Sequence, residues 1–233
     1  YAVDVPTAAL TLARHCWPGP LTLLLNKTNA VSHLVTGGRE TVAIRIPAND
    51  CARQIIEQCG HALAAPSANL FGHVSPTTAL HVLNDLGDKV DLIIDDGDCT
   101  IGVESTIVDF TTAQPQLLRP GGFPAEDLES IIGEQIHMPS GESRASGMLA
   151  SHYAPQCRVV LVDTIAEARQ ALSENGNARI LEHWDNSPLY AASLYTQMRQ
   201  ADSDGITAII AVLPNTSGLG LAIRDRLNKA SFL

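Results

Sequence analysis

The stretch CRVVLVDTIAEARQALSENGNARILEHW, residues 157–184, gives the clearest indication of architecture in this chain. Residues 157–163 form a short apolar run of the kind found in buried strands. Thr164 and Glu167 then have the spacing of a capping box ahead of a helical stretch. A second strand-like run follows at 178–184. A strand, a helix and another strand in this order predict a parallel βαβ unit.

The same alternation continues to the last residue. The pattern predicts a helix over 188–201, a fully buried strand over 206–214 and a final helix over 218–230. We therefore expect residues 157–233 to form a small Rossmann-like domain in which helices flank a parallel sheet. The final helix opens with GLGLA, as in a dinucleotide-binding loop, but it lacks the third glycine and a suitably placed acidic residue. A structural role is the favoured interpretation of GLGLA.

The first 136 residues mix strand and helix patterns without that regularity, and they predict an N-terminally incomplete α/β domain with a twisted open mixed sheet. Residues 137–156 are rich in Ser, Gly and Pro and have no hydrophobic period, which predicts a linker. Expected helices span 6–16, 50–60 (capped by Asp50 and ended by Gly60), the residues after Ser75-Pro76 (capped by Ser75), and 124–133. Expected strands span 21–25, 41–47, 61–69, 90–98 (with a turn), 103–110 and 116–120, the last two as a hairpin.

Composition narrows the class of protein. Of 233 residues, 45% are hydrophobic, 17% charged and 4% aromatic, which predicts a sizeable aliphatic core and argues against disorder. No apolar run reaches the length of a membrane span, and no signal peptide is readable, so we expect no membrane contact. The net charge is −10 with 15 scattered Lys and Arg, so contact with RNA is expected to be weak or indirect.

The cysteines and acidic residues give no convincing metal site. Five cysteines without CxxC spacing are typical of reduced cytosolic thiols. Zinc at Cys51, Cys59 and His61 would match no common ligand pattern. The DDGD turn at 95–98 could hold Mg²⁺, but an acidic turn is the favoured interpretation. No arrangement of Ser, His and Asp or of Cys and His is readable among the eight histidines.

The stretch AAPSANLFGHVSPTTAL, residues 64–80, carries more polar groups than a turn requires. An expected strand ends in Pro-Ser-Ala-Asn at 66–69, small residues leave space beside the chain, and Gly72 permits close backbone approach. Ser75, as an expected helix cap, would lie at the positive end of a helix, where anions bind. A phosphate-bearing ligand is one hypothesis. A loop in which Asn and Ser satisfy their own backbone is the alternative.

Two arginines and one short motif add candidates. Arg45 alternates with apolar neighbours in AIRIP, so its charge needs a carboxylate or phosphate partner. That partner is either a bound ligand or an acidic side chain in an ordinary internal salt bridge. Arg119 ends a strand before PGG and either reaches a phosphate or is solvated. Glu104, Ser105 and Thr106 in VEST either anchor a ligand through hydroxyls or reflect β-propensity alone.

Taken in order, WPGPLTLLL, TVAIRIP, APSANLFGHVSPT, GVESTIVDF and LLRPGGF resemble the YrdC-like family of threonylcarbamoyl-AMP synthases. SGMLASHYAP and GLGLAIRDRLNKA resemble the long form with an extra C-terminal domain. The resemblance covers essentially the whole chain. Each motif alone is weak, whereas their combination in this order is highly specific.

The resemblance implies that L-threonine, bicarbonate and ATP, with Mg²⁺ accompanying the nucleotide, give threonylcarbamoyl-adenylate and pyrophosphate. Other proteins then transfer the threonylcarbamoyl group to adenosine 37 of tRNA, in the cytoplasm. Positioning and charge stabilisation suffice for this chemistry, so no protein nucleophile and no protein metal ligand are expected. The implied threonine contacts are Arg45 (with the carboxylate), Ala65 (through its backbone) and Ser105. The implied ATP contacts are Thr41, Ser67, Asn69, Ser75, Arg119 and Tyr153, the last from the linker motif HYAP.

One departure from the family concerns a Lys-x-Arg motif, which normally meets the ATP phosphates and bicarbonate and precedes the stretch where this chain begins. No Lys-x-Arg occurs in these 233 residues, and the first residue is Tyr1 rather than Met. We therefore expect N-terminal residues to be missing and this polypeptide to have little or no synthase activity. Robust pyrophosphate release dependent on ATP, bicarbonate and threonine would contradict that expectation.

Two alternative functions remain open at this point. One is an RNA-binding or ribosome-associated module of the same fold, which the acidic charge disfavours and a steep salt dependence of RNA binding would revive. The other is a relative that forms a different carbamoyl-adenylate. ATP–pyrophosphate exchange with threonine and with other amino acids would separate the second alternative from the synthase.

Overall fold

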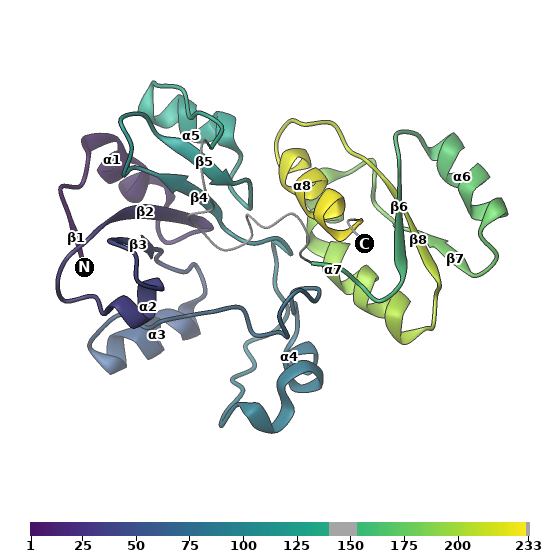
Figure 1. The fold of residues 1–233 in the computed structure, drawn as a ribbon, viewed down its shortest axis with the longest axis horizontal. Helices are drawn as coiled ribbons and strands as arrows, with labels where there is room; N and C mark the ends of the chain where they lie inside the picture. The colour runs from purple at the N-terminus through teal and green to yellow at the C-terminus, as the bar shows by residue number, and fades with distance from the viewer. Residues whose placement is uncertain (140–152, 232–233) are drawn as a thin grey trace. The chain divides into compact units, whose positions relative to one another are not determined.

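The computed structural model describes residues 1–139 and 153–231. By its internal contacts the chain forms two compact units (Figure 1). The first unit comprises Tyr1–Ala65 and Glu104–Met148, and the second comprises Pro66–Val103 and Leu149–Leu233.

A mixed sheet forms the centre of the first unit. Its strand order is β1-β2-β4-β5, and β3 pairs with β2. Strand β2 is parallel to β4 and antiparallel to β3, which confirms the expected open mixed sheet. Strands β4 and β5 are antiparallel, as the expected hairpin requires. The strands are β1 (Ala2–Val3), β2 (Leu21–Lys27), β3 (Thr41–Ile44), β4 (Thr106–Asp109) and β5 (Gln116–Arg119).

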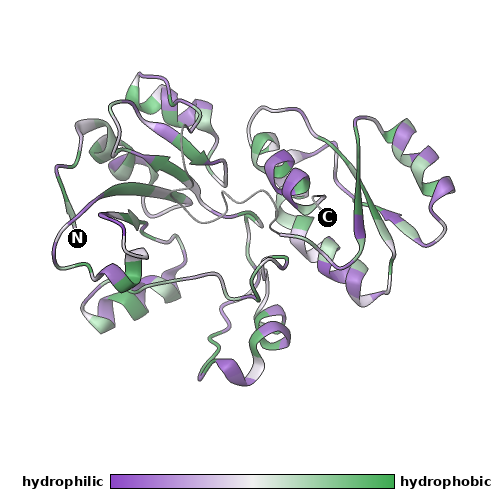
Figure 2. Ribbon diagram, in the orientation of Figure 1, coloured by the Kyte–Doolittle hydropathy of each residue, from purple (hydrophilic) through white to green (hydrophobic). Residues whose placement is uncertain are grey.

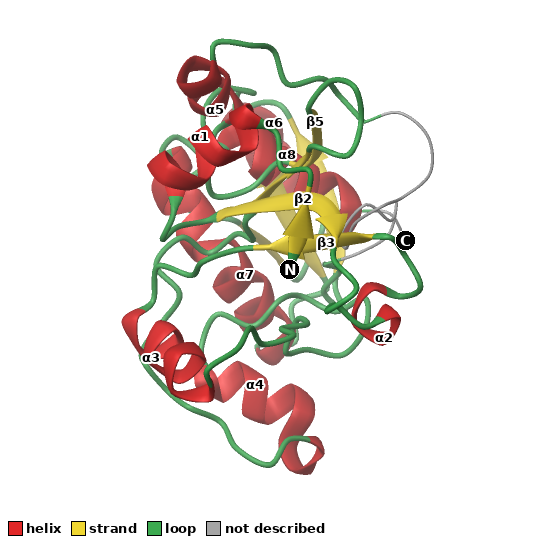
Figure 3. Ribbon diagram, turned by 90° about the vertical axis from the view of Figure 1, so that its left-hand side faces the viewer, coloured by secondary structure: helices red, strands yellow, loops and turns green. Residues whose placement is uncertain are grey.

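Two helices, α1 (Thr7–Cys16) and α5 (Ala125–Ile132), pack together beside β2 (Figure 3). Leu12 of α1 and Leu128 of α5 are fully buried. Figure 2 shows β2 as hydrophobic along most of its length, and five successive β2 residues from Leu21 are buried. Burial on both faces of a strand requires a near-continuous apolar run, which LTLLL supplies.

The remaining helices of the first unit are α2 (His33–Thr36) and α3 (Asp50–Cys59). Helix α3 ends at Gly60 in the left-handed conformation, as expected. Its cap, however, is Asn49, whose side chain accepts from the Ala52 backbone N–H, and not Asp50. Asp50 instead lies in the first turn, where a carboxylate favours the helix dipole.

The C-terminal part of the second unit is the expected parallel α/β domain. Its strands are in the order β6-β8-β7 and all run parallel. Thr164 Oγ1 accepts from the Glu167 N–H, and the Glu167 carboxylate accepts from the Asp163 N–H, so a reciprocal cap starts α6. The elements are β6 (Arg158–Val162), α6 (Ile165–Glu174), β7 (Ala178–Ile180), α7 (Ser187–Ser203), β8 (Ala208–Val212) and α8 (Gly220–Ala230).

GLGLA has a packing role at the start of α8. A Cβ on Gly220 would lie 1.9 Å from the carbonyl oxygen of Asn215, so the loop after β8 closes onto a residue without a side chain. This close approach explains the glycine without a nucleotide.

Three expectations about residues 61–98 are wrong. Residues 61–69 and 90–98 form no strand, and most of them are exposed. Strands need a hydrogen-bonded neighbour, and no described strand pairs with either segment. Ser75 does not cap a helix: α4 (Ala79–Leu86) starts at Thr78, whose hydroxyl accepts from the His81 N–H. A short 3₁₀ turn, η1 (Gly87–Lys89), follows α4.

The expected division into 1–136, 137–156 and 157–233 stays a prediction. Of the expected linker, residues 140–152 lie outside the described residues. Residues 66–103 group with the C-terminal elements in the second unit. In the part of the chain that the structure describes, no helix is both long enough and apolar enough to cross a bilayer.

Candidate functional site

A buried polar cluster in the first unit joins three strands of its sheet. Ser105, which precedes β4, shares a hydroxyl–hydroxyl hydrogen bond of 2.7 Å with Thr22 of β2. Arg119, at the end of β5, donates from Nε and Nη2 to the Ser105 carbonyl oxygen at 3.1 and 3.0 Å, and from Nη2 to the Ser105 hydroxyl at 3.1 Å. All three side chains are buried. Two predicted ligand contacts, Ser105 and Arg119, therefore share one hydrogen-bonded cluster.

The residues that follow Arg119, in the motif LLRPGGF, contact the backbone of VEST. A Cβ on Gly121 would lie 2.3 Å from the Glu104 carbonyl oxygen, and the Gly122 N–H donates to the same oxygen at 2.9 Å. Thr106 exchanges hydrogen bonds with the backbone of Phe123, through its hydroxyl, at 2.6 and 3.0 Å. Gly121 of LLRPGGF thus lets the chain cross directly over the backbone of VEST. LLRPGGF and VEST are therefore joined by hydrogen bonds and a close backbone contact.

The other predicted residues of the first unit lie on or after β3 and before the unit boundary. Thr41 opens β3 opposite Asn26 of β2 and is half-buried. Arg45 follows the last residue of β3 and is exposed. Ala65 is exposed in the segment where a strand was expected. An exposed Arg45 beside a strand end is accessible to a carboxylate, but its predicted role stays a prediction.

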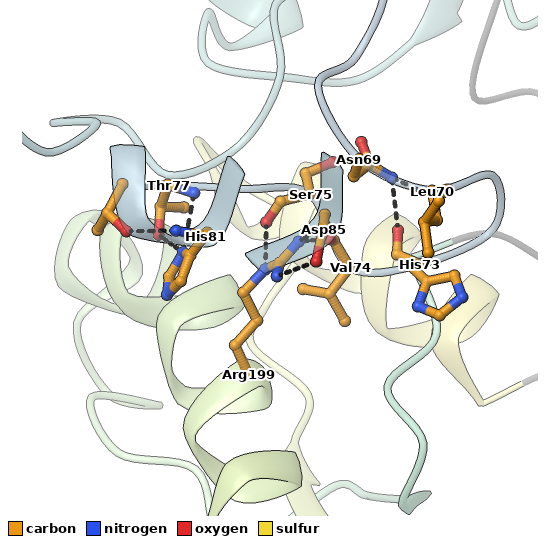
Figure 4. A network of polar contacts seen from close by, with 10 residues as sticks. Asn69, Leu70, His73, Val74, Ser75, Thr77, His81, Asp85 and Arg199 are labelled. Atoms are coloured by element: carbon orange, nitrogen blue, oxygen red, sulfur yellow. Dashed lines mark hydrogen bonds and ion pairs between the residues drawn. The ribbon is translucent and has the colours of Figure 1, made fainter. Parts of the chain in front are cut away.

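In the second unit, the loop of residues 69–78 is held by side chains and by α7 (Figure 4). Asn69 donates from Nδ2 to the carbonyl oxygens of Leu70 at 2.8 Å and His73 at 3.2 Å. Asn69 thus stabilises the turn itself, as the alternative interpretation of this stretch proposed. Ser75 is buried, and its carbonyl oxygen accepts from Arg199 Nε at 3.2 Å. Ser67 is exposed.

The start of α4 contains a histidine with a perturbed pKa. The Thr77 N–H donates to His81 Nδ1 at 3.2 Å, so this nitrogen acts as an acceptor. Burial lowers the pKa of His81 below its ordinary value, and the Arg199 charge lowers it further. The imidazole is therefore neutral at neutral pH and serves as a hydrogen-bonding group of the loop (Figure 4).

Tyr153 lies inside the second unit. Its ring stacks on Tyr195 of α7, with centroids 5.8 Å apart, and the Arg226 guanidinium of α8 lies 5.1 Å from the Tyr153 centroid. The side chain is 2% exposed, although the backbone adopts a φ of 64°. The energetic cost of this φ for a tyrosine is offset by cation–π and stacking contacts. Its predicted contact with ATP stays a prediction.

Three residues in these contacts, Thr22, Arg199 and Asp85, are not among the candidates predicted from the sequence. Thr22 is the one polar residue among the first five of β2, and a hydroxyl within LTLLL was a usable signal. Arg199 and Asp85 are 114 residues apart in sequence, and nothing in either local pattern predicts their contact. Among residues 1–139 and 153–231, no three His, Cys, Asp or Glu side chains gather in a way that could hold a metal ion.

Comparisons with known proteins cover nearly the whole chain. Residues 1–121 match the family model described as telomere recombination, that of the Sua5, YciO and YrdC proteins, and residues 123–231 match the model described as the C-terminal domain of threonylcarbamoyl-AMP synthase. The threonylcarbamoyl-AMP synthase of Pyrococcus abyssi is 40% identical over 99% of this chain and 75% of that protein. That of Bacillus subtilis is 38% identical over 97% of this chain and 73% of that protein.

A solved structure agrees with these matches. The crystal structure of P. abyssi Sua5 complexed with L-threonine superposes with a TM-score of 0.90 and 39% identity, covering 99% of this chain and 75% of that one. The two matched family models follow one another in the order expected of the two-domain form. The chain therefore belongs to the threonylcarbamoyl-AMP synthase family.

Proposed function

We propose that this chain binds L-threonine and ATP and, with bicarbonate, serves the synthesis of threonylcarbamoyl-adenylate. Membership of the family supports the reaction, and the similar P. abyssi structure was solved with L-threonine. The observation in this molecule that supports the proposal is the Thr22–Ser105–Arg119 cluster, because the Ser105 hydroxyl and the Arg119 guanidinium, two of the predicted ligand contacts, are hydrogen-bonded to each other.

The reaction needs two bonds to form in sequence. The amine of threonine attacks the carbonyl carbon of bicarbonate, and loss of water leaves a carbamate. A carbamate oxygen then attacks the α-phosphorus of ATP, and pyrophosphate leaves with the electron pair of the broken P–O bond. Every step is assisted by holding anions close together, which guanidinium and hydroxyl groups do without a covalent intermediate.

The proposed roles divide between the two substrates. Arg45 pairs with the threonine carboxylate, the Ala65 backbone contacts threonine, and the Ser105 hydroxyl completes that set. Arg119 contacts both Ser105 atoms and ATP, so it would join the threonine contacts to the nucleotide contacts. Thr41, Ser67, Asn69, Ser75 and Tyr153 complete the proposed ATP contacts.

We further propose that Mg²⁺ arrives with the nucleotide. The described residues offer no cluster of carboxylates or imidazoles for it, which fits an ion held mainly by phosphate oxygens. The product would pass to proteins that transfer the threonylcarbamoyl group to tRNA, and contact with tRNA itself would be weak. A cytoplasmic location is supported by the five cysteines, all of which are free thiols.

Threonine binding is the sharpest test, because it reports recognition of this substrate without requiring turnover. Calorimetric titration of the chain with L-threonine should show saturable binding. Arg45→Ala should weaken it at least about tenfold, because hydrogen bonds to charged groups contribute about 1.5–3 kcal/mol. Arg14→Ala, on the exposed face of α1, is the matched control and should leave affinity unchanged.

Two results would count against the proposal. Absence of threonine binding by the folded wild-type chain would overturn the proposed substrate. Equal threonine affinity of Arg45→Ala and wild type would remove Arg45 from the site while leaving the substrate in place.

A further inference from the structure

Arg199 of α7 forms hydrogen bonds with the backbone of the loop of residues 69–78 (Figure 4). Its Nε donates to the Ser75 carbonyl oxygen at 3.2 Å, and its Nη2 donates to the Val74 carbonyl oxygen. The same guanidinium forms a bidentate pair with Asp85 of α4, at 3.0 Å from Nη1 and 2.6 Å from Nη2. One side chain of α7 therefore fixes two consecutive peptide groups of the loop and the helix that follows them.

Other contacts hold the same loop at its two ends. Thr196, one turn before Arg199 on α7, shares a hydroxyl–hydroxyl hydrogen bond of 2.9 Å with Thr77. At the other end, the Ala154 N–H donates to the Gly72 carbonyl oxygen at 3.1 Å, so the residue after Tyr153 pairs with the loop. The loop is thus attached to elements more than 70 residues away in the sequence.

The Arg199–Asp85 pair is mostly buried, since both side chains are 14% exposed. Removing two charges from water costs free energy that their attraction only partly returns, and apolar residues of similar size often give equal stability. A planar guanidinium that donates to two carbonyl oxygens and a carboxylate fixes the orientation of these acceptor groups, which apolar packing does not. The arrangement is therefore better suited to fixing loop geometry than to raising stability.

We infer that Arg199 is a positioning residue that sets the 69–78 loop for nucleotide binding, so that the C-terminal domain controls the affinity of the synthase for ATP. The inference rests on the proposed function, because Asn69 and Ser75 of this loop are proposed ATP contacts. It adds a role for the C-terminal domain that no part of the proposed reaction requires. The proposed threonine contacts Arg45, Ala65 and Ser105 lie outside the loop, so threonine affinity should not depend on Arg199.

The test compares Arg199→Met and Arg199→Lys with the wild-type chain. Methionine keeps the apolar stem and removes every donor, whereas lysine keeps the charge and one set of donors. Arg179→Met is the matched control, because Arg179 pairs with Asp204 at 2.7 Å on the same domain but away from the loop contacts. ATP and L-threonine affinities are measured separately by titration. Amide exchange at Ala154 and Cys99, whose N–H groups donate to Gly72 and Thr77, reports the loop by NMR.

Arg199→Met should weaken ATP binding about tenfold and speed amide exchange at Ala154 and Cys99 by a similar factor. Threonine affinity should stay within about twofold, Arg199→Lys should recover part of the ATP affinity, and Arg179→Met should match wild type. A purely structural role would instead weaken both ligands equally. That result, or unchanged exchange at both amides in Arg199→Met, would overturn the inference.

The same titrations distinguish failure of the proposed function from failure of the role proposed for Arg199. If the wild-type chain bound no ATP, the proposed ATP contacts would be wrong. The inference that Arg199 positions the 69–78 loop for nucleotide binding would then be wrong as well. If wild type bound ATP and Arg199→Met bound it equally well, the proposed function would stand and only the role of Arg199 would fall.

Discussion

The Arg119 guanidinium clamps Ser105, donating twice to its carbonyl oxygen and once to its hydroxyl within 3.1 Å. A hairpin brings the two residues together, since β4 begins one residue after Ser105 and β5 ends at Arg119. The contact orients Ser105 whatever ligand is present. Arg119 is therefore already engaged with the protein before any phosphate arrives.

Arg119→Met should destabilise the first unit by about 1–3 kcal/mol, because it removes three hydrogen bonds to the buried Ser105. Urea unfolding followed by circular dichroism measures the change. Arg14→Met, which alters an exposed arginine, should change the free energy of unfolding by less than about 0.5 kcal/mol. Equal effects of the two substitutions would show that the clamp contributes nothing.

Gly121→Ala should displace VEST, because the new Cβ would meet the Glu104 carbonyl oxygen at 2.3 Å and that backbone has little room to shift. We expect a loss of about 1–3 kcal/mol in the free energy of unfolding and weaker threonine binding. Gly176→Ala is the control, since no atom lies within 4 Å of its Cβ position. Wild-type threonine affinity in Gly121→Ala would argue against a role for Ser105 in binding threonine.

Tyr153→Leu should destabilise the second unit by about 1–2 kcal/mol, because it removes both the stack on Tyr195 and the contact with Arg226. Tyr153→Phe keeps the ring and should retain most of the stability. Chemical unfolding of the two variants side by side distinguishes ring contacts from hydroxyl contacts. A Phe variant as unstable as the Leu variant would assign the effect to the hydroxyl group.

Thiol reactivity should divide the five cysteines into two classes. Burial raises the pKa of Cys16 to about 11 and that of Cys157 to about 12, and the neighbouring Asp202 adds to the second shift. Both thiols stay protonated and unreactive at pH 8. Cys51, Cys59 and Cys99 are not buried and should react quickly with a thiol reagent. All five should react in urea, and fast labelling of Cys157 in the folded chain would contradict its burial.

The same shifts give stability a pH dependence. In the unfolded chain these thiols lose their protons near the ordinary pKa of 9.0, whereas the folded chain retains them to about 11 and 12. A raised folded pKa contributes stability that is complete below pH 9 and is lost as pH rises through the folded values. The urea concentration at the midpoint of unfolding should therefore decrease as the pH is raised from 8 to 10.5.

The sequence alone determined the elements whose local pattern is unambiguous. The alternating runs after residue 157 gave the parallel sheet and its helices because strand and helix periods differ and short connections force a crossover. Thr164 and Glu167 formed the expected cap because a cap depends on residues three apart. The hairpin ending in Arg119 was equally local, and ordered motifs named the family without coordinates.

Which polar side chains meet depends on how the folded chain packs. Residues 61–69 have strand-like composition but form none, because a strand requires a partner that local sequence does not encode. The contact between Thr22 and Ser105 spans 83 residues, and that between Arg199 and Asp85 spans 114. Side-chain hydrogen bonds depend on distances of a few ångström that only the packed chain fixes, so no reading of local pattern could have found them.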